Sequence, residues 1–180
     1  MIIVDKIDEW GLYIGNSVMA LSDQVSNNYT HVINCTKDIP CPFAKINYLR
    51  IPVDDVSTDN IKVYFNEVFK FVETARKLKD TILLIHCAQG CSRSPTILLS
   101  YLMLKNKWSL KQSLEYVRSK RCGCGSACIC LNRTFPNIGF FKQLIELELE
   151  IGFNESSMSI QEYRGFDLST EVDMCLNEIF

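Results

Sequence analysis

The feature that most constrains the fold is a short apolar run, residues 81–86, that leads through a glycine-containing loop into a helix-forming segment. Consecutive apolar residues over this length predict a strand that is buried on both faces of a parallel sheet. Residues 94–106 predict a helix, and Pro95 suits its first turn because the missing N–H costs little there. The sequence therefore predicts a strand–loop–helix unit.

The same alternation of strand and helix extends over the first 150 residues. Further strands are predicted at residues 2–5, 11–15, 31–35 and 46–51, and further helices at 17–28, 59–78, 109–120 and 136–150. This order predicts an α/β fold with a central, mostly parallel, twisted sheet of about five strands flanked by helices. Binding sites in such sheets lie at the carboxyl ends of strands. The loop after residue 86 is therefore the first candidate site.

Composition narrows the class of protein. The chain has 180 residues and a net charge of -2, which argues against a general nucleic-acid-binding protein. The sequence contains neither an apolar stretch of about 18 residues nor a signal-peptide pattern. We expect a cytoplasmic protein, with the nucleus as a second compartment, and no membrane span. The sequence does not indicate an oligomeric state.

The loop itself combines residues that suit phosphate chemistry. Successive N–H groups in such a loop can form an anion-binding nest, and the helix N-terminus adds a partial positive charge. Gly90 permits an unusual backbone angle, and the planar guanidinium of Arg93 can bind two phosphate oxygens. The predicted phosphate contacts are Ala88, Gln89, Gly90, Cys91, Ser92 and Arg93.

Cys87 is the predicted nucleophile of this loop. Helix N-termini and nearby cations favour the thiolate form of a cysteine, and a thiolate can attack phosphorus to give a phosphocysteine intermediate. Ser94 can donate a hydrogen bond to the sulfur and help it leave when water hydrolyses that intermediate. We expect His86 to support the loop by hydrogen bonds and not to transfer protons.

The stretch "HCAQGCSRS" matches the H-C-x5-R-[ST] signature of the cysteine-based protein phosphatases. From about Ile7 to Glu148 the chain resembles the dual-specificity branch of that superfamily, with "LYIGN" and "NIGFFKQLIELE" near the two ends. The resemblance implies a protein-tyrosine-phosphatase-like fold, a phosphorylated protein as substrate and no cofactor. It also implies a catalytic domain at residues 1–150, with a Cys-rich insertion at 121–134, and a C-terminal extension at 151–180.

Ester cleavage also needs a general acid for the leaving oxygen. The loop "RIPVDDVSTDN" offers three carboxylates, and the resemblance implies that Asp55 is the acid, with Asp54 as the alternative. Asp59 is interpreted as the N-cap of the following helix. The resemblance also implies that Arg121 borders the pocket and meets a second substrate phosphate or an acidic residue. Its alternative role is to interact with the helix dipole.

The substrate class rests on the resemblance. The chain lacks an equivalent of the "KNRY"-type loop that deepens the pocket of tyrosine-specific relatives, which implies hydrolysis of phosphoserine, phosphothreonine and phosphotyrosine. Phosphoinositide phosphatases often carry lysines where this loop has Ala88, Gln89 and Cys91. RNA 5′-triphosphatases, which also resemble this branch, usually have Asn-Arg-Thr-Gly where this chain has Ser-Arg-Ser-Pro. Both alternatives stay open, as does a phosphate-binding pseudoenzyme that acts as an adaptor.

Two further features concern cysteine. Four of the nine cysteines, Cys122, Cys124, Cys128 and Cys130, form a C-x-C-x3-C-x-C cluster. The cluster has three interpretations: a zinc site, a site of palmitoylation or oxidation, or a loop without a special role. Thiolates are suitable zinc ligands, but C-x-C is not a common spacing for zinc sites. Cys91 is either a redox partner of Cys87 or a packed small residue.

Overall fold

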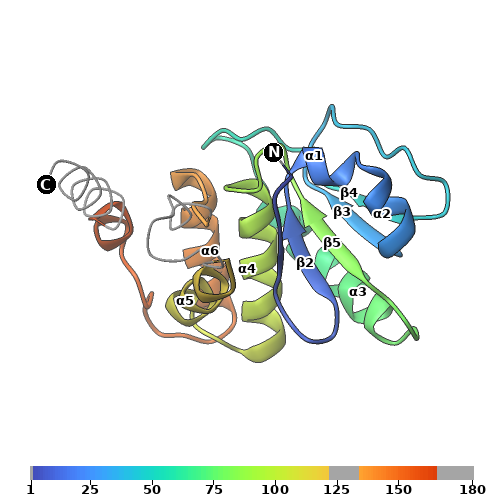
Figure 1. Cartoon of the computed structure of the whole chain (residues 1–180). Helices are drawn as coiled ribbons and strands as arrows, with labels where there is room; N and C mark the ends of the chain where they lie inside the picture. Colours follow the sequence, from blue (N-terminus) through green and yellow to red (C-terminus); the bar gives the residue numbers. More distant parts are fainter. Residues whose placement is uncertain (1, 122–133, 166–180) are drawn as a thin grey trace, which may run out of the picture.

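A five-stranded mixed sheet forms the centre of the molecule (Figure 1). The computed structural model describes residues 2–121 and 134–165. The strand order is β1 (Val4–Lys6), β2 (Leu12–Gly15), β5 (Leu83–His86), β3 (His31–Asn34) and β4 (Asn47–Arg50). Only β1 is antiparallel to its neighbour; the other pairs are parallel. The predicted fold class is therefore confirmed, and the apolar run of residues 81–86 contains the central strand, β5.

Side chains on successive residues of β5 pack against different groups of helices. Leu83 and Ile85 belong to the main core, whereas Leu84 packs with residues of α1 and α2 on the other face. The labelled helices of the described residues are α1 (Ser17–Ala20), α2 (Asp23–Asn28), the 3-10 helix η1 (Lys62–Tyr64), α3 (Phe65–Arg76), α4 (Arg93–Asn106), α5 (Leu110–Arg121) and α6 (Ile138–Glu150), and residues 160–165 are also helical. Because both faces of β5 are covered, an uninterrupted apolar strand is stable there.

Helix α4 is the central helix of the main layer, and it begins directly after the loop that follows β5. Its residues from Arg93 to Met103 are all buried, since it packs on the sheet and against α3, α5 and α6. A helix covered on all sides is apolar all around, which explains the continuous run "TILLSYLML". This burial fixes the N-terminus of α4 beneath the candidate loop.

Two predicted helices differ in the structure. The segment predicted at 17–28 divides into α1 and α2, with Ser22 as the N-cap of α2. The segment predicted at 59–78 starts as η1, whose N-cap is Ile61. The interpretation of Asp59 as a helix N-cap is therefore wrong. Its carboxylate instead accepts a hydrogen bond from the backbone N of Asp54 at 2.7 Å and so closes a turn.

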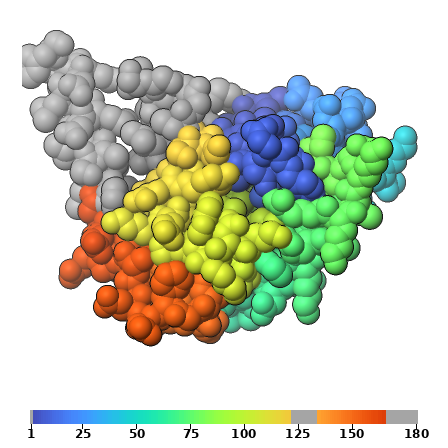
Figure 2. Space-filling view, turned by 90° about the horizontal axis from the view of Figure 1, so that it is seen from below, coloured from blue at the N-terminus to red at the C-terminus, as the bar shows by residue number. Residues whose placement is uncertain are grey.

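The chain continues past α6 and folds back onto the helical layer. Glu148 is fully buried, and its carboxylate accepts hydrogen bonds from the backbone N of Leu110 at 2.7 Å and of Ser157 at 2.9 Å. Figure 2 shows the red-orange surface of the segment after α6 beside the yellow surface of α5, where the backbone N of Lys111 donates to the hydroxyl of Ser157. Within residues 2–121 and 134–165, no helix has the length and apolar character needed to cross a bilayer.

Candidate active site

The loop between β5 and α4 is held from outside by its backbone carbonyl groups. Ser17 donates to the carbonyl of Ala88 from both its backbone N and its hydroxyl, each at 3.0 Å. Arg121 donates to the carbonyl of Gly90 at 2.7 Å, and the backbone N of Phe135 donates to the carbonyl of Cys91 at 2.7 Å. In a trans peptide the N–H points away from the C=O. The amides of residues 89, 91 and 92 therefore point to the inner side of the loop.

Cys87 lies at the floor of this loop, with 1% of its surface exposed. Its sulfur accepts a hydrogen bond from the backbone N of Gly90 at 3.1 Å and one from the hydroxyl of Ser94 at 3.3 Å. Gly90 has a φ of +78°, and a Cβ at this position would lie 2.8 Å from the carbonyl oxygen of Gly15. Glycine is thus required both for the loop conformation and for its contact with β2.

Arg93 and Asp55 meet above the first turn of α4. The guanidinium of Arg93 donates to the carbonyl of Val53 at 3.1 Å, and its Nε lies 3.8 Å from Asp55 Oδ2. Asp55 Oδ1 accepts from the hydroxyl of Ser92 at 2.6 Å and from the side-chain amide of Asn137 at 2.9 Å. The carboxylate is therefore positioned by the loop on one side and by the start of α6 on the other.

Asp55, Ser92, Arg93 and Asn137 belong to the wall of a pocket of about 640 Å³. The pocket is lined by Asp55, Ala88, Gln89, Cys91, Ser92, Arg93, Phe135 and Asn137. Cys87 is not among these lining residues; its buried thiol lies in the same loop, 3.1 Å from the backbone N of Gly90. The thiol, the inward-pointing amides, the guanidinium of Arg93 and the carboxylate of Asp55 together form the candidate site. This combination can bind a phosphate, attack it and protonate a leaving oxygen.

Known proteins show the same domain. The family model "Dual specificity phosphatase, catalytic domain" matches residues 12–150. The chain is 32% identical over 159 residues to "Dual specificity protein phosphatase 1" of Arabidopsis thaliana, with 87% of this chain and 75% of that protein covered.

The chain belongs to the dual-specificity phosphatase family. Solved structures agree with this assignment. The crystal structure of DUSP15 superposes with a TM-score of 0.68 at 30% identity and covers 91% of this chain and 94% of that one. Human DUSP28 has a TM-score of 0.71 at 22% identity, with 83% and 95% covered, which shows the shared fold.

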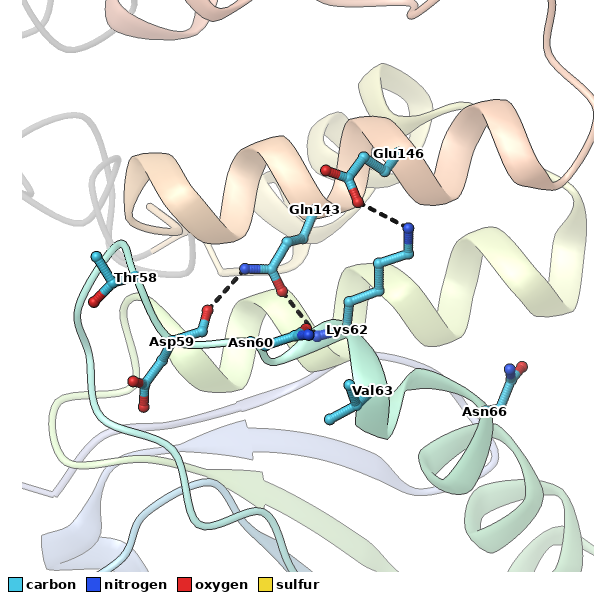
Figure 3. Close-up of a pocket in the computed structure, with 8 residues that line it drawn as sticks. All are labelled: Thr58, Asp59, Asn60, Lys62, Val63, Asn66, Gln143 and Glu146. Carbon is cyan, nitrogen blue, oxygen red and sulfur yellow. Dashed lines mark hydrogen bonds and ion pairs between the residues drawn. The ribbon is translucent and has the colours of Figure 1, made fainter.

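The three carboxylates of residues 50–60, Asp54, Asp55 and Asp59, have different surroundings. Asp54 pairs with Lys37 at 2.5 Å, and its side chain is 57% exposed. The carboxylate of Asp59 accepts a hydrogen bond from the backbone N of Asp54. The backbone carbonyl of Asp59 accepts one from the side-chain amide of Gln143 at 2.8 Å, as Figure 3 shows. Gln143 also accepts from the backbone N of Lys62 at 2.9 Å. Of the three, only Asp55 lines the pocket among the described residues.

Arg121 does not occupy the place expected at the border of the pocket. Its side chain is 1% exposed, its Nε donates to Asp5 Oδ2 at 3.0 Å, and it also bonds the carbonyl of Gly90. The pocket residues of the described chain do not include it. The reason is Asp5 on β1, which supplies a buried partner for the guanidinium. In this structure Arg121 positions the phosphate loop from behind.

His86 is buried in β5, with 1% of its surface exposed, and its Nδ1 lies 3.4 Å from the carbonyl oxygen of Cys87. Burial lowers the pKa of His86 to about 4, so the ring is neutral near neutral pH. Cys91 contacts the carbonyl of Gln89 through its sulfur at 3.6 Å, and Cys87 is a free thiol. The Cys122–Cys130 cluster lies outside the described residues.

Sequence reasoning missed several residues that hold the site. Asn137 is the N-cap of α6: its side-chain oxygen accepts from the backbone N of Gly139 and Phe140, which leaves its NH2 group for Asp55. An asparagine before a helical pattern is a recognisable N-cap signal, but the bond to Asp55 has no local signal. Phe135 of the pocket wall and Asp5 likewise carry no pattern of their own.

Proposed function

We propose that this chain hydrolyses phosphate monoesters on tyrosine, serine and threonine residues of proteins through a phosphocysteine intermediate. The observation that supports it most directly is the sulfur of Cys87, which accepts two hydrogen bonds at the base of a loop whose amides point inward. Such donors stabilise the thiolate, and the same loop offers Arg93 for the charge that develops on the phosphoryl oxygens.

In the first step the Cys87 thiolate attacks phosphorus, and the bond between phosphorus and the ester oxygen breaks. Arg93 and the loop amides bind the three equatorial oxygens. Asp55, 3.8 Å from the Arg93 guanidinium, gives its proton to the leaving oxygen. The dephosphorylated side chain leaves as a neutral hydroxyl, and the phosphate stays on sulfur.

In the second step water attacks the phosphocysteine. Asp55, now a carboxylate, accepts a proton from the water, and the sulfur–phosphorus bond breaks. The hydroxyl of Ser94, 3.3 Å from the sulfur, donates to the departing thiolate. Inorganic phosphate is released, and both Cys87 and Asp55 return to their starting forms.

The pocket lining favours a protein substrate. Arg93 is the one cation among the described residues that line it, whereas the places where phosphoinositide phosphatases carry lysines hold neutral side chains. Phe135 adds an aromatic ring to the wall, which suits a phosphotyrosine side chain. A pseudoenzyme adaptor is disfavoured, since thiol, guanidinium, hydroxyl and carboxylate all occupy places that serve the reaction.

The test is turnover of 4-nitrophenyl phosphate and of peptides that carry phosphotyrosine, phosphoserine or phosphothreonine. Cys87→Ser should abolish release of phosphate, whereas Cys41→Ser should keep it, because Cys41 is a free thiol in the loop after β3 whose sulfur accepts hydrogen bonds from Asn34 and Arg50. An inactive wild-type protein that still binds phosphate would support the adaptor. Preference for a phosphoinositide or an RNA 5′-phosphate over every peptide would overturn the protein substrate.

A further inference from the structure

The segment that follows α6 contains a tyrosine that is almost completely buried. Residues 151–165 lie beyond the matched family domain, which ends at residue 150. Tyr163 nevertheless has only 1% of its surface exposed, and Met158 has 3%. A large aromatic side chain near the end of the described chain is therefore part of the core.

Tyr163 is packed between two phenylalanines. Its ring stacks on Phe141 of α6, with centroids 3.7 Å apart and planes at 9°, and on Phe135, with centroids 4.9 Å apart and planes at 15°. Its hydroxyl donates to the backbone carbonyl of Pro136 at 2.6 Å. Ring and hydroxyl thus hold consecutive residues, Phe135 and Pro136, against the body of α6.

These residues form the pocket wall with Asn137. Phe135 and Asn137 both line the pocket, and the backbone N of Phe135 bonds the phosphate loop at Cys91. The backbone N of Asn137 bonds the hydroxyl of Ser92 at 3.0 Å, and its side chain bonds Asp55. The segment 135–137 therefore lies between Tyr163 and the acid.

We propose that Tyr163 is a positioning residue of the active site, which makes residues 151–165 a working part of the catalytic unit. Tyr163 fixes the wall of residues 135–137 from behind, and the wall fixes Asp55 through Asn137. The inference rests on the proposed function, because it assigns Tyr163 a role in proton delivery by Asp55. Loss of the ring should weaken acid assistance more than phosphate binding.

The experiment compares two substrates in the full chain. Phenyl phosphate has a poor leaving group and needs the acid, whereas 4-nitrophenyl phosphate has a good one and needs it less. Tyr163→Leu should lower kcat/KM for phenyl phosphate about tenfold, a part of the roughly 10²–10⁴-fold that a general acid provides, and for 4-nitrophenyl phosphate about threefold or less. Tyr163→Phe keeps the stacked ring and should stay close to wild type.

The ratio of the two kcat/KM values separates positioning from stability, since a smaller folded fraction lowers both values equally. Asp55→Asn gives the limiting change of this ratio. Tyr101→Leu is the matched control, because it removes a buried tyrosine ring that lies outside the pocket lining, so it should lower both values without changing their ratio. An unchanged ratio in Tyr163→Leu with an active wild type would overturn this inference alone; a wild type inactive on both substrates would overturn the proposed function as well.

Discussion

The two sides of the pocket are built in different ways. The phosphate side is one continuous segment, in which Cys87 and Ser94 are buried and the backbone is fixed by bonds from Ser17, Arg121 and Phe135. The other side, called the acid side after the role that we propose for Asp55, is assembled from distant segments, and the side chain of Asp55 is 35% exposed. A buried, preorganised loop suits electrostatic stabilisation, whereas a carboxylate that exchanges protons with water needs partial access. The two sides should therefore respond differently to substitution.

The largest effect is expected on the phosphate side. Arg93→Lys replaces a planar fork by a point charge and should lower kcat/KM by about 10²–10³-fold, as loss of a preorganised donor to an oxyanion does. The value of kcat/KM should fall by the same factor for phenyl phosphate and 4-nitrophenyl phosphate, because Arg93 binds the phosphoryl group that both contain. The measurement is kcat/KM on the two esters. A loss confined to phenyl phosphate would contradict the division between the two sides.

On the acid side, the loss of activity caused by a substitution should depend on the leaving group of the substrate. Asp55→Asn cannot donate a proton, so turnover of phenyl phosphate should fall by about 10²-fold and that of 4-nitrophenyl phosphate by much less. Competitive inhibition by inorganic phosphate should change little. Asp54→Asn is the matched control, since Asp54 pairs with Lys37 outside the pocket. Full activity of Asp55→Asn on phenyl phosphate would remove Asp55 as the acid.

Ser94 tests the second step on the phosphate side. Ser94→Ala removes one donor to the departing thiolate and should slow hydrolysis of the phosphocysteine at least about tenfold, since a hydrogen bond to a charged group contributes about 1.5–3 kcal/mol. Formation of the intermediate should be less affected, so a pre-steady-state burst of 4-nitrophenol should appear. Equal slowing of both steps would instead indicate that Ser94 acts only on the structure of the loop.

The same division explains what could be predicted from the sequence. The strand, loop and helix around Cys87 are encoded in neighbouring residues, and their predicted order is confirmed by the sheet and by α4. Asn137 and Tyr163 act on Asp55 only through tertiary contacts, which spacing along the chain does not show. Arg121 illustrates the same limit: its partner Asp5 lies 116 residues away and on a different element.

A domain boundary at residue 150 stays a prediction. The family match ends there, but the buried Tyr163 and the bond from the Ser157 amide to Glu148 attach residues 151–165 to the helical layer. Composition gave no sign of this, because a weakly patterned polar segment can still contribute one large aromatic residue to a core. Burial of single residues is thus more informative here than average polarity.

The smallest effect concerns stability and again belongs to the phosphate side. His86 is neutral in the folded protein because burial lowers its pKa from 6.5 to about 4, whereas in the unfolded chain it is protonated below 6.5. As pH falls from 6.5 towards 4, the unfolded state therefore binds a proton that the folded state does not, and stability decreases. Well above pH 6.5, His86 is neutral in both states, and its titration no longer lowers the free energy of unfolding. At about pH 5.5 the expected loss is about 1 kcal/mol.

Chemical denaturation at neutral and mildly acidic pH measures this loss. Carboxylates also destabilise the fold on acidification, so the test is the difference between wild type and His86→Gln, which should lose about 1 kcal/mol less over the same interval. His31→Gln is the matched control: burial also lowers the pKa of His31, but by less, so most of the acid sensitivity should persist. Identical pH dependence in wild type and His86→Gln would mean that His86 has the same pKa in the folded and unfolded states, which would contradict a neutral, buried His86 in β5.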